Sequence, residues 1–420
     1  MNILYVSQYF PPEMGAPAAR ASELSCHWVR AGHRVTVLTG FPNHPTGIIA
    51  PGYRVPFCRI IYRESFHGVN VLRTWLLPFP NRKAWERMLN YSSFCLSSAL
   101  AGLRISAPDV VVGSSPQLLV ALSACWLARA KRVPFIFEVR DLWPESLTAV
   151  GVGGDNSFLH RSLKKIASFL YRQADQIVVV TPAFKQHIAA AYNIPSSKIS
   201  LIPNGVEAAH FSPDQVDESL RNRLGIESKF TICYIGTMGM AHGLESLVEA
   251  ARFLHASHPE IVFLLVGEGA EKQRLIAHSG SLGLKNIRFI DQQPRAVIPH
   301  YINASDAALV LLKKSDIFKT VIPTKMLEFM SCARPLMVGV EGEAKKLVEE
   351  AQAGLCFEPE NPKALVQAIL KLAAEPSLRQ AYGRNGRRFI IEHLSRRQTA
   401  LDYLDLLNNF VLPAARSKAA

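Results

Sequence analysis

Several features that define other protein classes are missing from this chain of 420 residues. Its seven cysteines form no Cys-x-x-Cys pair, so neither a zinc site nor a disulfide framework is indicated, and scattered cysteines suit a reducing cytosol. No basic segment with a cleavage site precedes the first strand-like run, so no export signal is expected. The best candidate for a membrane span, residues 118–128, has about 11 residues where a bilayer needs about 20.

Acidic residues are scarce in the first half of the chain. Residues 1–204 contain 21 Lys and Arg against 10 Asp and Glu, whereas residues 205–420 contain 26 against 24. A basic face can meet nucleic acid, an anionic bilayer or an anionic substrate. No zinc finger, RNP-like strand or basic heptad accompanies the charge, so nucleic acid is not expected as a partner. No Asp-x-Asp pair occurs, which argues against a metal site built on paired aspartates and predicts that no cofactor is needed.

Strand-like runs alternate with helical patterns along the whole chain, which predicts an α/β protein with parallel sheets covered by helices on both faces. The predicted strands lie at 3–7, 34–39, 109–113, 134–139, 176–181, 230–236, 261–267, 287–290, 307–311 and 336–339. Turn formers at 203–206 mark a linker between two Rossmann-like domains, 1–203 and 207–389, and a final segment, 390–413, is expected to cross back to the first domain. Two such domains would face a cleft between the carboxyl ends of their sheets, where α/β proteins bind ligands.

The most informative segment is 323–335, with the sequence PTKMLEFMSCARP. Thr324 opens a predicted helix, and Lys325 and Glu328 fall on one face of it. A lysine at a helix start suits a diphosphate, because the free N–H groups there already favour an anion. A glutamate one turn later can accept hydrogen bonds from two ribose hydroxyls. The segment therefore predicts a nucleotide-sugar pocket, and the alternative is a plain surface Lys–Glu pair.

Two further loops of the second half lie at the ends of predicted strands. Gly236 and Thr237 stand in a glycine-rich loop before a helix, which is the shape of a phosphate cradle, and Glu268 could meet a sugar or a base. Lys313 and Lys319, in a lysine-rich loop before the 323–335 segment, would neutralise a diphosphate leaving group, unless the loop is merely a solvated basic surface.

The first half offers its own candidates at strand ends. Gly15 and Ala16 stand before a helix, where backbone amides can approach a phosphate closely. They do not form Gly-x-Gly-x-x-Gly, so the dehydrogenase fingerprint is absent. Asp141, at the tip of the fourth strand, could bind a sugar hydroxyl or polarise an acceptor hydroxyl. His44 lies in a loop after the second strand, but a lone loop histidine is more often without function.

Taken in order, these motifs resemble the family 4 glycosyltransferases, which have the GT-B fold. The segments that carry the resemblance are PPEMGAPAAR (11–20), AGHRVTVLT (31–39), IPNGV (202–206), VGEG (266–269) and PTKMLEFMSCARP (323–335). The additional motifs FPNHPTG (41–47) and RDLWPES (140–146) are similar to those of N-acetyl-fucosamine-type transferases of O-antigen or capsule assembly.

The resemblance implies retaining, metal-independent transfer from a nucleoside-diphosphate sugar, usually with UDP, to a lipid-linked or glycan acceptor in surface-polysaccharide biosynthesis. The family's ribose-binding glutamate matches Glu328. Its other motif glutamate falls on Thr320, and its usual Arg/Lys pair falls on a run that holds His242, so neither role carries over. Lys319 and Lys325 are expected to take over the diphosphate. An inactive sugar-nucleotide scaffold and a sugar-nucleotide 2-epimerase are the alternatives.

Two basic amphipathic segments, 82–96 and 158–172, suggest where a cytoplasmic enzyme would work. In the second segment the basic residues share one face, and the leucines and isoleucine, at 159, 163, 166 and 170, share the other. The first segment adds Arg82 and Lys83 beside aromatic residues. We expect peripheral docking on an anionic inner-membrane surface near a polyprenyl-diphosphate-linked acceptor. The alternative is that the apolar face packs in the core.

Overall fold

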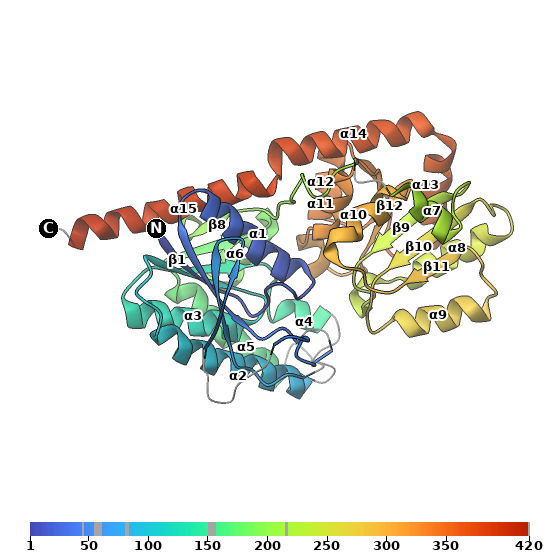
Figure 1. Cartoon of the computed structure of the whole chain (residues 1–420). Coiled ribbons are helices and arrows are strands. Elements are labelled where there is room, and N and C mark those ends of the chain that lie inside the picture. Colours follow the sequence, from blue (N-terminus) through green and yellow to red (C-terminus); the bar gives the residue numbers. More distant parts are fainter. Residues whose placement is uncertain (44–45, 54–60, 80–83, 150–156, 215–216, 419–420) are drawn as a thin grey trace. The chain divides into compact units, whose positions relative to one another are not determined.

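The computed structural model describes residues 1–43, 46–53, 61–79, 84–149, 157–214 and 217–418 (Figure 1). His44, Arg82 and Lys83, which the sequence analysis names, lie outside these ranges. The chain forms two compact units. The first contains Met1–Asn204 together with Arg396–Ala420, and the second contains Gly205–Ser395. Each unit is described by itself below.

The first unit is built on an eight-stranded sheet in the order β3-β4-β2-β1-β5-β6-β7-β8, parallel except for the edge strand β3. Its strands are β1 (Asn2–Val6), β2 (Arg34–Gly40), β3 (Ile61–Phe66), β4 (Val69–Thr74), β5 (Val110–Ser114), β6 (Phe135–Val139), β7 (Gln176–Val179) and β8 (Ile199–Leu201). Its helices are α1 (Ala16–Arg30), α2 (Ala84–Leu103), α3 (Leu118–Lys131), α4 (Glu145–Ala149), α5 (Phe158–Gln173), α6 (Pro182–Tyr192) and α15 (Arg396–Lys418). Central strands such as β5 and β6 are buried along their whole length, as expected where helices cover both faces.

The second unit is built on a six-stranded parallel sheet in the order β11-β10-β9-β12-β13-β14. Its strands are β9 (Phe230–Ile235), β10 (Ile261–Val266), β11 (Ile287–Ile290), β12 (Ala307–Leu311), β13 (Leu336–Gly339) and β14 (Gly354–Cys356). Its α-helices are α7 (Glu218–Leu224), α8 (Glu245–His255), α9 (Lys272–Ser281), α10 (Ile298–Asn303), α11 (Thr324–Ser331), α12 (Glu343–Ala351), α13 (Pro362–Ala374) and α14 (Pro376–His393). Short 3-10 turns lie at Met240–His242, Arg295–Val297 and Ile317–Thr320.

The predicted α/β class with two parallel sheets is confirmed, and the ten predicted strands all form. Four strands, β3, β4, β8 and β14, and two short helices, α4 and α7, were not predicted. β3 has Arg63 and Glu64 in its centre and alternates only weakly in burial, because it is an edge strand that faces solvent. The final helix begins at Arg396 rather than near 390, because α14 continues to His393. Within the described part of the chain, no helix is both long enough and apolar enough to cross a bilayer.

Candidate functional site: the carboxyl end of the second sheet

The order of strands in the second unit creates a switch point between β9 and β12. Strands β10 and β11 follow β9 on one side of it, whereas β12, β13 and β14 extend on the other side. Loops that leave neighbouring strands in opposite directions open a crevice at the carboxyl ends of those strands, which is where open α/β sheets bind ligands. The loop after β9 and the helix α11, which follows β12, both lie at this switch point.

Lys325 reaches from the first turn of α11 to the end of β9. Its Nζ atom lies 3.9 Å from the centroid of the Tyr234 ring, and a Cβ atom added to Gly236 would lie 3.4 Å from it. The Nζ atom is buried and has no hydrogen-bond partner within the described residues. Burial lowers the pKa of Lys325 to about 7, although the charge of Glu328 acts in the opposite direction. A buried ammonium group without a counter-ion is costly, so this site favours an anionic ligand.

His242 stands beside this lysine. Its Nδ1 atom lies 3.2 Å from the carbonyl oxygen of Gly239 and donates to it in the tautomer that carries the proton on Nδ1. Burial, reinforced by the positive charge of Lys325, lowers the pKa of His242 to about 3. The histidine is therefore neutral at physiological pH, and the charge at this end of β9 comes from Lys325.

Glu328, the predicted ribose ligand, lies one turn after Lys325 on α11. Its Oε1 atom accepts a hydrogen bond of 2.7 Å from Nη1 of Arg295, and both side chains are partly buried. The guanidinium group of Arg295 also stacks over the ring of Phe211, 4.9 Å from its centroid. Arg295 was not predicted, because it lies 33 positions from its partner in the sequence. This contact holds the Glu328 carboxylate in position.

Backbone contacts hold the glycine-rich loops after β9 and β10 against each other. The amide of Met238 donates to the carbonyl of Glu268 over 2.8 Å. Any Cβ atom on Gly267 would come within 2.0 Å of the Gly236 carbonyl oxygen, so the two loops can approach this closely only with glycine. The Glu268 carboxylate accepts from Nζ of Lys272 at 2.5 Å, so its present partner is α9. The carbonyl oxygen of Thr237 accepts from the Tyr234 hydroxyl over 2.6 Å.

In the predicted lysine-rich loop, one lysine is partly buried and another is exposed. Lys313 is partly buried, and its backbone amide donates to the carbonyl oxygen of Ala241, which ties the loop to the end of β9. Lys319 is exposed instead, and its ammonium group forms ion pairs with Asp316 at 2.8 Å and Glu341 at 3.5 Å. The structure therefore brings Lys325 to Tyr234 and Gly236 but gives Lys319 acidic partners of its own.

Three predicted residues lie at the corresponding edge of the first sheet. Gly15 directly precedes α1 with a φ of 144°, a conformation that favours glycine, and Ala16 begins the helix. Asp141 follows β6, and its Oδ2 atom accepts from the Trp143 indole over 3.3 Å. Burial raises the pKa of Asp141, although hydrogen bonds from Ser146 and Trp143 oppose this shift. Asp141 is therefore a partly buried carboxyl group with donors already around it.

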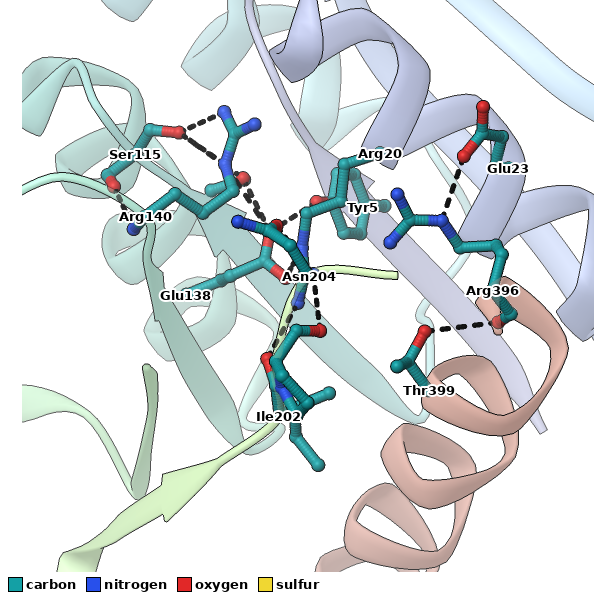
Figure 2. A network of polar contacts seen from close by, with 12 residues as sticks. Tyr5, Arg20, Glu23, Ser115, Glu138, Arg140, Ile202, Asn204, Arg396 and Thr399 are labelled. Atoms are coloured by element: carbon teal, nitrogen blue, oxygen red, sulfur yellow. Dashed lines mark hydrogen bonds and ion pairs between the residues drawn. The ribbon is translucent and has the colours of Figure 1, made fainter. Parts of the chain in front are cut away.

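A buried charge network in the first unit was not predicted (Figure 2). The Glu138 carboxylate, in the middle of an apolar strand, accepts from Nε of Arg20 at 2.9 Å and from the hydroxyls of Tyr5 at 2.5 Å and Ser114 at 2.7 Å. Burial alone would raise the pKa of Glu138, but the guanidinium groups of Arg20 and Arg140 lower it. In the sequence, this network could have been suspected only from single charged residues within the otherwise uncharged runs AARAS and FIFEV.

Helix α1 contacts the chain at both places where it passes between the two units: after Asn204, where it leaves the first unit, and at Arg396, where it returns. Nη1 of Arg20 donates to the Pro203 carbonyl and to Oδ1 of Asn204, each over 3.1 Å, just before the unit ends. One turn later on α1, Glu23 accepts from Nε of Arg396 at 2.8 Å, where the chain re-enters the unit. Figure 2 shows that Arg20 and Glu23, which make these two contacts, both lie on α1. One helix therefore holds both the last residues before the second unit and the first residues after it.

Comparison with known families agrees with this architecture. Residues 15–205 match the model of the glycosyl transferase 4-like domain, and residues 216–389 match that of the glycosyl transferases group 1. The chain is therefore a glycosyltransferase with the GT-B fold, built from two Rossmann-like domains, as predicted.

Individual relatives and solved structures are consistent with this assignment. The chain is 25% identical over 382 residues to WcaI of Escherichia coli K12, a protein named for glycosyl transfer in colanic acid biosynthesis, with 88% of this chain and 91% of WcaI covered. Among solved structures, sucrose-phosphate synthase from Thermosynechococcus elongatus has a TM-score of 0.74 at 18% identity, with 99% of each chain covered. Anabaena HepE, solved in complex with UDP, has a TM-score of 0.70 at 15% identity, with 97% of this chain and all of HepE covered.

Proposed function

We propose that this glycosyltransferase moves a sugar from a UDP-sugar to a lipid-linked or glycan acceptor during the assembly of a bacterial surface polysaccharide, with retention of the anomeric configuration. A sugar linked to polyprenyl diphosphate is the proposed acceptor. The proposal is supported by the name of WcaI, by the UDP bound to HepE, and by the structural likeness to WaaG, a glycosyltransferase of lipopolysaccharide biosynthesis. We further propose that no metal or other cofactor takes part.

The observation that carries the proposal is the ammonium group of Lys325, which lies buried beside the glycine loop after β9 and has no hydrogen-bond partner among the residues that the structure describes. In the proposed complex, Lys325 contacts the donor diphosphate, and Glu328 accepts hydrogen bonds from the ribose hydroxyls while Arg295 holds its carboxylate. The bond between the sugar C1 and the diphosphate oxygen breaks with its electron pair on the diphosphate, where Lys325 stabilises the growing charge. The acceptor oxygen then bonds to C1 and transfers its proton to an oxygen of the leaving diphosphate. Asp141 is the proposed partner of the acceptor hydroxyl.

Turnover distinguishes this proposal from its alternatives. The purified enzyme would be incubated with a panel of UDP-sugars and a polyprenyl-diphosphate-linked sugar, and the products analysed by mass spectrometry and by NMR of the new linkage. We expect an elongated acceptor with the anomeric configuration of the donor. Conversion of the donor to an epimer without an acceptor would identify a 2-epimerase, and nucleotide binding without turnover would identify a scaffold.

A further inference from the structure

Three helices of the first unit form one layer, and the outward face of this layer is unusual. The Ser98 hydroxyl on α2 donates to the Ser123 hydroxyl on α3 over 3.0 Å, and Gly102 allows the side chain of Leu127 to approach closely. On α3, Arg129 stacks over the ring of Phe169 of α5, 5.8 Å from its centroid. Figure 1 shows α2, α3 and α5 along the same side of the unit. We call the solvent side of these three helices the α2–α3–α5 face.

Helix α2 is apolar on two opposite sides. Its inner side, which includes Phe94 and Ala101, is fully buried against the rest of the unit. Leu96, Leu100 and Leu103, at helical spacing on the opposite side, are 68%, 59% and 48% exposed. Residues 88–103 contain no charged side chain. A surface helix of a soluble protein normally has charged residues along its outer side, and α2 has none after Arg87.

The neighbouring helices extend this apolar surface and surround it with positive charge. Trp126 on α3 and Phe158 and Phe169 on α5 are also exposed. The three helices contain the basic residues Arg87, Arg129, Lys131, Arg161, Lys164, Lys165 and Arg172, and a single acidic residue, Glu86. The face therefore combines leucine and aromatic side chains with basic groups that hardly any acid neutralises.

We propose that the α2–α3–α5 face docks on the surface of an anionic lipid bilayer. Exposed leucine and aromatic side chains gain free energy at the boundary between headgroups and acyl chains, and basic side chains are attracted to lipid phosphates. The charge favours a bilayer over a second copy of the chain, because two copies that met through this face would bring their basic residues together without acidic partners. The proposal concerns where the enzyme works, and the donor site in the second unit shares no residue with this face.

The surface that docks differs from the one expected from the sequence. Leu163 and Leu170 were predicted to face the membrane, but they are buried in the core of the first unit. The correct side of α5 is its basic side, because Phe158 and Phe169 lie there beside Lys165 and Arg172. Leu100 and Leu103 of α2 are also exposed, and they lie beyond the segment 82–96 that the sequence predicted for docking.

Co-sedimentation of the full chain with vesicles tests the proposal. Vesicles of phosphatidylcholine alone would be compared with vesicles that also contain phosphatidylglycerol, at low and at high salt. We expect binding to the anionic vesicles that weakens as salt rises. The double variant Leu96→Ser/Leu100→Ser should lower the partition coefficient about tenfold or more. The double variant Lys165→Gln/Arg172→Gln should lower it about fivefold per residue.

A matched control comes from the second unit. Phe253, on α8, is 42% exposed, and Phe253→Ser should bind vesicles as the wild type does. All variants should keep the melting temperature and the UDP-induced thermal shift of the wild type, so a failure of docking remains distinct from a failure of the donor site. Equal binding of the leucine variant and the wild type would overturn the proposal. A dimer of the wild type that Leu96→Ser/Leu100→Ser dissociates in light scattering would also overturn it, because the face would then join two copies of the chain.

Discussion

The two units share one architecture and differ in where they keep their charges. In the second unit the ion pairs lie mostly at the surface, as in Lys314–Glu358 and Lys345–Glu349, and the helices carry both signs of charge. In the first unit a carboxylate and two arginines are buried together around Glu138, while the outer side of α2 exposes leucines. One unit thus presents an ordinary solvated surface, and the other presents an apolar and basic one. The difference teaches that two sheets of the same kind can carry helices with very different outer surfaces.

The largest expected effect is on stability, and it comes from removing the buried carboxylate of the first unit. Glu138→Ala leaves the guanidinium groups of Arg20 and Arg140 without their carboxylate, so the free energy of unfolding should fall by about 3–5 kcal/mol. Glu349→Ala, which removes an exposed pair of the second unit, should change it by about 0–1 kcal/mol. Urea unfolding of both variants measures the contrast, and equal effects would refute it.

The pKa of Glu138 gives this contrast a pH dependence. Because its folded-state pKa is lowered, the pair stabilises the protein above the ordinary glutamate pKa, and this contribution is lost as the pH falls through the folded value. The gap in stability between the wild type and Glu138→Ala should therefore be constant near neutral pH and should narrow in acid.

Within the second unit, Lys325 should matter far more for activity than the exposed lysines of the same region. Lys325→Met removes the charge proposed to stabilise the leaving diphosphate, so kcat should fall at least about 100-fold. Lys314→Met, which breaks an exposed pair with Glu358, should leave kcat nearly unchanged. Steady-state kinetics with saturating donor would measure kcat of both variants. An unchanged kcat for Lys325→Met would remove this lysine from the mechanism.

The same substitution should stabilise the enzyme in the absence of ligand. The pKa of Lys325 is lowered from its ordinary value to about 7, so the unfolded chain binds the extra proton between about pH 7 and the ordinary lysine pKa, and stability rises with pH over this range. Lys325→Met has no such proton to bind. Its gain in melting temperature over the wild type should be largest near pH 6 and smallest near pH 10, and a pH-independent gain would contradict the burial of the charge.

The smallest expected effect is that of metal removal. The proposed donor site relies on a lysine for the diphosphate, so turnover after exhaustive treatment with EDTA should equal that of the untreated enzyme. An activity that EDTA abolishes and a divalent ion restores would mean that the diphosphate is neutralised differently.

The sequence predicted the fold well, because strands buried on both faces appear as apolar runs such as IVFLLV at 261–266, and turn formers separate them from helices. It predicted the helix that carries Lys325 and Glu328 from local spacing. Partners distant in the chain could not be predicted in this way. Arg295 meets Glu328 only after β11 and β12 have taken their places in the sheet, on opposite sides of β9. The roles of Arg20 and Glu138 depend on burial that no local pattern encodes.

The most direct test of the donor site is the melting temperature of the wild type, Glu328→Ala and the control Glu349→Ala with UDP, GDP, TDP and ADP. A ligand at about 100 times its Kd adds about 2.7 kcal/mol to the stability of the protein that binds it, which is a readable shift. We expect UDP to stabilise the wild type and Glu349→Ala but to have little effect on Glu328→Ala. An equal UDP shift in all three proteins, or no shift with any of the four nucleotides, would contradict the nucleotide site at the carboxyl end of the second sheet.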